Sequence, residues 1–597
     1  MGLFTTYPTT RPRDLAGTYD YIIVGGGTAA CVLANRLSED ESVSVLVVER
    51  GDVKDGFISR VPLLSSHFAS DGSRSRLWES TPQAHVNDRV FQMAAGCSLG
   101  GSSKINAMLY TRGLPGEYNS WSQAGRNKAS DFHGVAGEWQ NRSFQPYFWK
   151  NTPYIIEGAT AMGIPYVDDL NSPLHSSFGC AKMHYSLDRW GRRSSAFSAF
   201  LPAQLVKERR RRLHICVRTL VLKIDIHETS SGVLKAGGVF LQSLGEKFPS
   251  RYIGVRREVI LCAGALSSPQ ILMLSGVGPA DHLARHGIPI LKDLPGVGSH
   301  LQDHLGAAPQ YRVPLRDSII KLKLQPWITI IQLLMYIFFG VGMMLGNVLD
   351  VSIFMQSRLF DGKYNAVVNS EEDRDASLPE NVPDVEVMAI VARDMSASVS
   401  ERQPAQIDRR RGKSDVSYTS DASKSTRDGG LGFLAVNLRP TSLGTVRLFS
   451  SDPKEDPVID PNYLSTDHDR EVMRKSVRFP MQLKEKMAAR GYPITDFRIP
   501  AGDSDEEVDE FVRQVCETTY NYSSTCRMAP EYDGPRPGGV VDDRLCVHGV
   551  QGLRVADASV FPHILSTHLA APVVAVAQKC ADMINENRAA EALNGRH

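Results

Sequence analysis

The sequence has almost no net charge and no pattern typical of a metal site. Its 67 basic and 66 acidic residues leave a formal charge of +1, so composition gives no electrostatic reason to expect binding to nucleic acid or to an anionic membrane. The nine cysteines are scattered, and none shows the C-x-x-C spacing of a metal or redox site. We therefore expect reduced, mostly buried thiols, no bound metal and no nucleic-acid partner.

Long hydrophobic runs are also scarce. The first residues contain no apolar leader of the signal-peptide type, so we expect an intracellular, cytoplasmic protein. The exception is Trp327 to Leu345 (WITIIQLLMYIFFGVGMML), which carries no charge. A membrane span there would place two parts of one fold on opposite sides of the bilayer. We expect a buried or substrate-channel helix, and a monotopic membrane contact is the less favoured alternative.

Residues 18–49 predict a βαβ unit that binds a dinucleotide. A short apolar strand, Tyr21 to Val24, leads into the turn Gly25-Gly26-Gly27-Thr28-Ala29-Ala30, a helical segment and a second strand that ends at Glu49. In a G-x-G-x-x-G/A turn the first glycine permits the bend, the second lets pyrophosphate approach, and the third position stays small for packing. Glu49, about 20 residues further on, suits the ribose hydroxyls. This motif does not separate FAD from NAD.

Strand-then-helix patterns recur far along the chain. Val259 to Cys262 reads as a buried strand, followed by a Gly-Ala-Leu-Ser-Ser-Pro turn and an apolar helix, Gln270 to Leu274. Near the end, a strand at 553–557 precedes a helix at 572–584. These patterns indicate one α/β domain assembled from distant segments, with a second domain inserted between them. Within the insert, 396–429 is polar with few aromatic residues, and we expect a mobile surface loop.

Several longer motifs resemble the signatures of the glucose–methanol–choline (GMC) family of FAD-dependent oxidoreductases. They are Gly96 to Gly113 (GCSLGGSSKINAMLYTRG), Gly264 to Gly278 (GALSSPQILMLSGVG), Leu294 to Gly298 with Leu301 to His304, and Leu438 to Val446. The resemblance runs from about residue 20 to 584, nearly the whole chain. It implies an α/β fold (α+β overall) with a Rossmann-like FAD-binding domain, 18–114 plus 181–305 plus 517–590. The inserted substrate-binding domain, 115–180 plus 306–516, is expected to have an antiparallel sheet with helices.

The resemblance also implies where FAD is held. Asn106 to Leu109 are expected along the isoalloxazine ring, Val221 at the adenine, and Asp557 with Ala558 at the pyrophosphate and ribityl chain. No histidine lies between Gly100 and Asn106, so we expect non-covalent FAD. The predicted cofactor residues are Gly25, Gly27, Thr28, Ala29, Ala30, Glu49, Ser102, Ser103, Asn106, Ala107, Met108, Leu109, Val221, Asp557, Ala558 and Leu569.

The sequence departs from the family at the proton-accepting histidine. The family's H-P-x-G-T-C-x-M segment reads N-Y-S-S-T-C-R-M here, which puts Asn521 in the position of the base, while the second catalytic position is His568. An amide cannot accept a proton near neutral pH, whereas an imidazole can. Three hypotheses follow. His568 takes the proton while Asn521 orients the substrate oxygen, or the substrate is an easily deprotonated alcohol, or the scaffold catalyses a non-redox step such as cyclisation or dehydration. We favour the first, because one imidazole still meets the need for a general base.

The insert is expected to cover the flavin and to select the substrate. The apolar segment contributes Trp327, Tyr336, Phe338, Phe339, Met343 and Met344; if part of it lines the pocket, the substrate is apolar and sizeable, and otherwise these residues are core. We predict oxidation of an alcohol on a hydrophobic small molecule in a specialised metabolic pathway, with electrons passing to FAD and then to oxygen or another acceptor. The alternatives are an FAD-containing cyclase or lyase, and a catalytically inactive flavoprotein, which the intact His568 disfavours.

Overall fold

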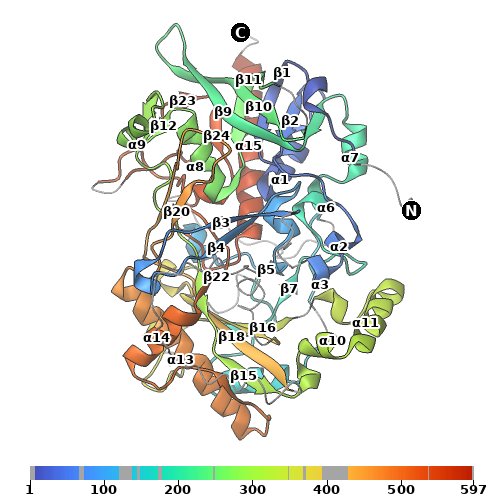
Figure 1. Cartoon of the computed structure of the whole chain (residues 1–597), viewed down its shortest axis with the longest axis vertical. Helices are drawn as coiled ribbons and strands as arrows, with labels where there is room; N and C mark the ends of the chain where they lie inside the picture. The colour runs from blue at the N-terminus through green and yellow to red at the C-terminus, as the bar shows by residue number, and fades with distance from the viewer. Residues whose placement is uncertain are drawn as a thin grey trace, which may run out of the picture.

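The computed structural model describes residues 7–65, 73–119, 137–143, 148–172, 178–245, 249–346, 348–367, 371–392, 428–534 and 537–594. These residues form two halves, each with its own sheet and hydrophobic core (Figure 1). The predicted mobile loop, 396–429, lies outside the described residues apart from its last two positions, and Gly429 is the first residue of a strand.

The upper half contains an eight-stranded sheet. Its strand order is β23-β10-β11-β1-β2-β8, with β24 beside β11 and β9 beside β10. The pairs that β1, β2, β8 and β24 make are parallel, whereas β9, β10 and β11 form an antiparallel meander. The bounds are β1 Thr18–Val24, β2 Val45–Val48, β8 Leu213–Cys216, β9 Thr219–Glu228, β10 Leu234–Ser243, β11 Arg251–Leu261, β23 Val550–Gln551 and β24 Leu553–Val555.

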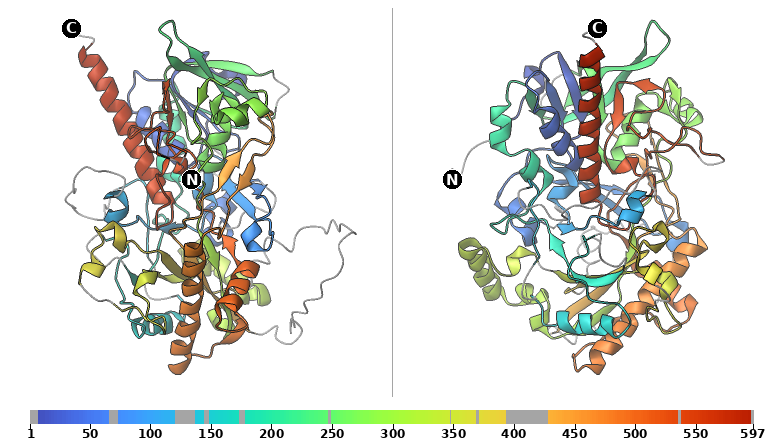
Figure 2. Two further views of the ribbon diagram at one scale, coloured as in Figure 1. Left: turned by 90° about the vertical axis from the view of Figure 1, so that its left-hand side faces the viewer. Right: turned by 180° about the vertical axis from the view of Figure 1, so that it is seen from behind.

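Helices from the two ends of the chain cover this sheet together. Helix α1 (Thr28–Leu37) and the C-terminal helix α15 (Ala570–Asn594) pack side by side, as the right-hand view of Figure 2 shows. Strand β11 pairs with β1 on one side and with β24 on the other. The predicted mixed α/β fold, assembled from distant segments, is confirmed. The other helices of this half are α6 Ala196–Phe200, α7 Ala203–Glu208, α8 Gly264–Leu274 and α9 Ala280–Arg285.

The lower half contains an antiparallel sheet of eight strands. Its order is β21-β15-β18-β17-β16-β6, and β14 joins it by pairing with β18 and with β22. Helix α13 packs on β18. The bounds are β6 Gly179–Lys182, β14 Leu305–Ala307, β15 Gln310–Val313, β16 Leu349–Met355, β17 Val385–Ile390, β18 Gly429–Asn437, β21 Thr495–Arg498 and β22 Glu517–Thr518, with helices α5 Thr152–Thr160, α13 Asp467–Ala489 and α14 Asp505–Val515. We propose that this half is the inserted domain. Strands β6 and β22 each extend two residues beyond the bounds that the sequence predicted for it.

The turn between β1 and α1 closes against the end of β11. Gly25 has φ +97°, and a Cβ there would lie 2.5 Å from the carbonyl oxygen of Cys262. A side chain at this position would collide with backbone as well as strain its own conformation. The first glycine of the motif therefore brings the two central strands' loops together at one edge of the sheet.

Helix α8 begins earlier than the sequence indicated. The predicted turn at Gly264 to Pro269 is the start of the helix, which runs from Gly264 to Leu274. Pro269 has no N–H to donate to the carbonyl of Ala265 four residues before it. The hydroxyl of Thr525 donates to that carbonyl instead, at 2.5 Å. A distant side chain thus satisfies the group that proline leaves unpaired.

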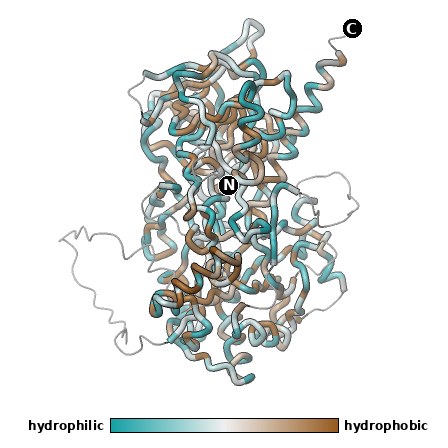
Figure 3. The backbone as a smooth tube through the Cα atoms, turned by 90° about the vertical axis from the view of Figure 1, so that its right-hand side faces the viewer, coloured by the Kyte–Doolittle hydropathy of each residue, from teal (hydrophilic) through white to brown (hydrophobic). Residues whose placement is uncertain are grey.

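The sequence predicted a buried or substrate-channel helix within Trp327 to Leu345; burial is wrong, and the substrate-channel alternative stays a prediction. Helix α11 (Pro326–Phe339) follows α10 (Ile320–Leu324), and Tyr336 is the one buried residue among its fourteen. Trp327 is 61% exposed and Phe338 72%. Apart from Tyr336, the buried residues of this segment are those of the short 3-10 helix η5 (Met343–Leu345). Figure 3 shows the hydrophobic helix on the face that lies to the right in Figure 1. Among the described residues, no helix is long and apolar enough to cross a membrane.

Thr525→Val tests the link between α8 and the Thr-Cys-x-Met segment. The substitution keeps the side-chain volume but removes the donor to the Ala265 carbonyl, so we expect the free energy of unfolding to fall by about 1–3 kcal/mol. Urea unfolding measures the change. Thr495→Val, at an exposed position of β21, is the matched control and should change stability by less than about 0.5 kcal/mol. Equal stabilities of the two variants would contradict this account of α8.

Candidate active site

One large cavity lies between the two halves. Its volume is about 1680 Å³, and it is lined by residues of the β1–α1 turn, the start of α8, the end of β22 and the segment before α15. A drug-sized ligand needs roughly 300–1,000 Å³. The cavity therefore has room for a dinucleotide cofactor together with a substrate.

The cavity wall fits a dinucleotide where glycines line it. A Cβ at Gly264 would meet no atom within 4 Å, and one at Gly27 would meet only the Cys262 carbonyl at 3.6 Å. Side chains at these two positions would thus enter the cavity rather than touch protein. Gly27 also precedes α1, whose N-terminus has no side-chain cap. Uncapped N–H groups and the helix dipole make this a suitable place for a pyrophosphate.

Glu49 connects the glycine turn to the strand end. Its Oε2 accepts from the Gly26 N–H and its Oε1 from the Gly51 N–H, both at 2.6 Å. Burial raises the pKa of this carboxyl above its ordinary value, although the two N–H groups act in the opposite direction. Glu49 lines the cavity, so its remaining lone pairs are available to ribose hydroxyls.

Asp557 shapes the opposite wall. Its Oδ2 accepts from the Gly264 N–H at 2.8 Å and from the Ser268 hydroxyl at 2.6 Å, and its Oδ1 accepts from the Ser559 N–H at 2.8 Å. Both oxygens are therefore engaged by the protein. The carboxylate fixes the start of α8 and the turn after β24. An anionic group that enters the cavity here would approach the backbone rather than this carboxylate.

The cavity brings together most of the residues that the sequence predicted. Two of them do not line it: Ala30 is fully buried in α1, and Met108 packs in a small apolar cluster with Met183 and Leu349. The small Ala30 fits its expected packing role. The predicted residues that do line the cavity are Gly25, Gly27, Thr28, Ala29, Glu49, Ser102, Ser103, Asn106, Ala107, Leu109, Val221, Asn521, Asp557, Ala558, His568 and Leu569.

Asn521 is held firmly at the cavity wall. Its backbone N–H donates to Oδ1 of Asp303 at 2.8 Å. Its side-chain Nδ2 donates to the hydroxyl of Thr519 at 3.0 Å and to the Thr519 carbonyl at 3.3 Å. Because both contacts of the amide are made by its nitrogen, Oδ1 is the atom left to accept a hydrogen bond from a molecule in the cavity.

His568 is backed by a buried carboxylate. Its Nε2 lies 3.3 Å from Oε1 of Glu386, which is on β17 and has a side chain only 2% exposed. Burial opposes the charge on Glu386, yet His568, Ser352 and His304 outweigh it and bring the pKa of this carboxyl below its ordinary value. An ionised carboxylate only accepts, so Nε2 is the donor in this contact.

The segment Asp303–His304 contacts Asn521 through Asp303 and lies beside His568 through His304. Burial raises the pKa of Asp303 to about 6, against the hydrogen bonds it accepts, the first of which comes from Thr518. Burial lowers the pKa of His304 to about 4, and the neighbouring His568 acts in the same direction. His304 is therefore neutral at neutral pH, and it leaves Glu386 as the charged partner of His568.

Sequence reasoning missed Glu386 and gave no role to Asp303 or His304. Glu386 is the single acidic residue in the otherwise apolar strand Val385–Ile390, which is the signal that could have drawn attention to it. Nothing in the sequence places it near His568. The pair forms because β17 and the segment before α15 meet at the boundary between the halves.

Comparison with known proteins identifies the family. Models of the GMC oxidoreductase family match residues 19–306 and residues 440–577. The chain belongs to the GMC oxidoreductases. It is an FAD-dependent oxidoreductase that acts on CH–OH donors, as the sequence predicted.

GMC relatives span nearly the whole chain. An oxygen-dependent choline dehydrogenase of Pectobacterium atrosepticum is 30% identical over 96% of this chain and 95% of its own length. The corresponding protein of Cronobacter sakazakii is 32% identical, with 95% of each chain covered. A fungal aryl-alcohol oxidase structure superposes with a TM-score of 0.76 at 25% identity, covering 96% of this chain and all of that one. Pyridoxine 4-oxidase from Mesorbium loti has a TM-score of 0.74 at 24% identity, covering 95% and 99%, which shows the shared fold.

Glu49→Gln tests the cofactor side of the cavity. The amide keeps one acceptor but turns a donor toward a backbone N–H, so one charge-assisted hydrogen bond is lost at the turn expected to hold FAD. We expect the dissociation constant for FAD to rise by at least about tenfold, because such a bond is worth roughly 1.5–3 kcal/mol.

Fluorescence titration of FAD into deflavinated protein measures the effect of Glu49→Gln. Glu41→Gln, whose side chain is 87% exposed, is the control and should leave the affinity unchanged. Unaltered FAD affinity in Glu49→Gln would remove Glu49 from the cofactor site.

Proposed function

We propose that this GMC enzyme oxidises an alcohol group of an apolar small molecule, with His568 as the general base. The observation that carries the proposal is the contact between His568 and the buried, ionised Glu386. FAD, when bound, accepts hydride from the substrate carbon. The protein side chains must then bind the hydroxyl, remove its proton and exclude water.

Asn521 is suited to orienting the hydroxyl. Its Oδ1 accepts the substrate O–H when the alcohol enters, before that single hydrogen turns to His568 for the transfer, and Thr519 prevents the amide from rotating. Holding the hydroxyl in one orientation also fixes the direction of the neighbouring carbon–hydrogen bond, so fewer conformations are sampled before the reactive geometry is reached. The amide contributes no proton transfer, so the base has to be another residue.

His568 is suited to taking the proton because Glu386 stabilises the cation that results. Nδ1 accepts the hydroxyl proton while Nε2–H remains directed at Oε1 of Glu386. The ion pair that forms is buried, where charge attraction is stronger than in water. This arrangement favours retention of alcohol oxidation over the cyclase or lyase alternative, for which the replacement of histidine by Asn521 is the sole support.

The substrate part of the cavity is mainly aliphatic. The aliphatic lining away from the glycine turn includes Ile58, Leu63, Leu64, Ile319, Ile320, Leu322, Met344, Val348, Leu349, Met388, Ile390 and Leu434, and the aromatic residues Trp78, Tyr520 and Tyr522 also line the cavity. Of the apolar segment Trp327 to Leu345, only Thr329 and Met344 line it, whereas Trp327, Tyr336, Phe338, Phe339 and Met343 do not. Hydrophobic lining favours an apolar alcohol, with selectivity set by size and shape.

His568→Ala tests the base. We expect kcat/KM for the alcohol to fall by about 10²- to 10⁴-fold, because the hydroxyl proton loses its acceptor. FAD content should change little, whereas the free energy of unfolding should fall because the buried Glu386 loses its partner. Anaerobic stopped-flow measurement of flavin reduction reports the step directly.

The matched control for His568 is His563→Ala, an exposed histidine five positions earlier that should keep full activity. If His568→Ala reduces flavin at the rate of the unmodified enzyme, the proposed proton transfer is wrong.

The substrate class is tested by anaerobic spectra of the holoenzyme with a panel of long-chain aliphatic, benzylic and allylic alcohols, and with choline. We expect an apolar alcohol to bleach the oxidised flavin faster than choline does, because aliphatic side chains outnumber the aromatic Trp78, Tyr520 and Tyr522 in the lining. Bleaching by choline alone would contradict the apolar substrate. Consumption of an alcohol without bleaching would favour the non-redox alternative.

A further inference from the structure

Helix α11 carries an apolar face that no other part of the described structure covers. The apolar face is defined by Trp327, Ile330, Ile331, Leu334, Ile337, Phe338, Phe339 and Val341, whose exposed fractions range from 44% to 76%. The first six follow one side of the helix, whereas Phe339 is its last residue and Val341 lies just beyond its C-cap Gly340. Soluble monomers rarely expose contiguous apolar patches of this kind without a binding role.

The inner side of α11 explains why the helix is stable in this position. Tyr336 packs with Val61, Met344 and Leu345 in a small separate cluster, and its hydroxyl donates to the carbonyl of Gly191. Gln332 accepts from the N–H of Met343 at 2.8 Å. The helix is thus anchored along one side, and its outward orientation does not result from fraying.

We propose that the apolar face docks on an anionic phospholipid surface. The helix has no charged residue over its fourteen positions, and about 21 Å of helix is too short to span roughly 30 Å of hydrocarbon. A helix of this composition lies in the plane of the interface with its apolar side among the acyl chains. A protein interface of ordinary size carries several direct hydrogen bonds, and this face offers only the indole N–H of Trp327.

Cations beside the apolar face match the charge of anionic headgroups. Lys323 lies on α10, directly before α11, and Arg189 lies over the ring of Trp190 at 5.0 Å, whereas Lys321 on α10 donates to the Arg316 carbonyl. Within the described ranges, neither Lys323 nor Arg189 forms an ion pair. Lysine and arginine side chains of this kind extend to the headgroups, while tryptophan prefers the same interfacial depth.

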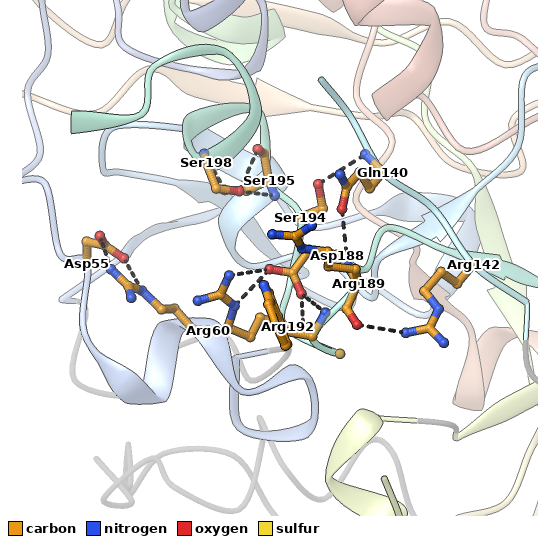
Figure 4. Close-up of polar contacts among 12 residues, drawn as sticks. Asp55, Arg60, Gln140, Arg142, Asp188, Arg189, Arg192, Ser194, Ser195 and Ser198 are labelled. Atoms are coloured by element: carbon orange, nitrogen blue, oxygen red, sulfur yellow. Dashed lines mark hydrogen bonds and ion pairs between the residues drawn. The ribbon is translucent and has the colours of Figure 1, made fainter. Parts of the chain in front are cut away.

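The nearby acidic groups are already neutralised. Asp188 accepts from Arg192 at 2.8 Å, and Asp55 accepts from Arg60 at 2.7 Å, as Figure 4 shows around the turn that carries Arg189. Trp190, on this turn, is 61% exposed and lies against the C-terminal end of α11. The turn therefore adds an aromatic ring and an uncompensated cation to the same surface.

The docking face borders the active-site cavity. Thr329 on α11, Lys323 on α10 and the exposed Ile58 all line that cavity. An apolar substrate dissolved in lipid would reach the cavity beside α11 without crossing water. This consequence rests on the proposed function, whereas the docking itself does not.

Vesicle co-sedimentation of the holoenzyme tests the docking without any turnover, so its result is independent of the substrate assignment. We expect binding to phosphatidylcholine vesicles and tighter binding when phosphatidylserine is included. Ile330→Gln, Leu334→Gln and Phe338→Gln together should reduce partitioning by at least about 100-fold on both, because three side chains lose their burial in the acyl region. Arg189→Gln with Lys323→Gln should lower binding to the anionic vesicles by roughly fivefold per charge and leave neutral vesicles unaffected.

The matched control is Ile290→Gln, Phe449→Gln and Leu593→Gln, at positions 47% to 66% exposed elsewhere on the chain, which should bind like the unmodified protein. Flavin absorbance and thermal unfolding establish that each variant is folded. The proposal is overturned if the unmodified protein binds no vesicle, or if the α11 triple variant binds as well as the control. It is also overturned if sedimentation velocity shows self-association that the triple variant abolishes, since the face would then bind a second copy of the chain.

Discussion

The carboxylate of Asp557 is the interaction on which the site depends most directly. It accepts hydrogen bonds from the start of α8 and from the turn after β24, and so joins two segments nearly three hundred residues apart. Thr525 reinforces the same junction by satisfying the carbonyl that Pro269 leaves unpaired. Because these contacts fix the cavity wall, the glycines that line it can remain without side chains and still hold a defined shape.

The position of the reacting pair follows from the same junction. Asn521 reaches the cavity because Asp303 and Thr519 hold its backbone and amide, and His568 reaches it because the chain passes from the β24 turn into α15. Glu386 enters from the other half, on β17. A base on one half and its counter-charge on the other would make proton transfer depend on how closely the two halves approach.

The local arrangement of charges in this protein is more informative than its net charge. The net charge of +1 gave no reason to expect an anionic partner, yet Lys323 and Arg189 lie beside the apolar face of α11. Acidic residues elsewhere on the chain balance these cations, so the net charge does not reveal the local group. The opposite holds at the active site, where Glu386 is a single charge whose effect depends entirely on burial and on its contact with His568.

Sequence alone determined the parts that local pattern controls. The glycine turn, the strand ending in Glu49, the long family motifs and the positions of Asn521 and His568 are all contiguous in the chain, so FAD, the α/β fold and the reaction class followed from them. Tertiary structure alone decided where α8 begins, that α11 lies outside the core, and that Glu386 stands behind His568. Each of these depends on a contact between residues distant in sequence: Thr525 with Ala265, Tyr336 with Gly191, and β17 with the segment before α15. An apolar run has the same sequence pattern whether it faces the core or the solvent, and only the packing of the folded chain distinguishes the two.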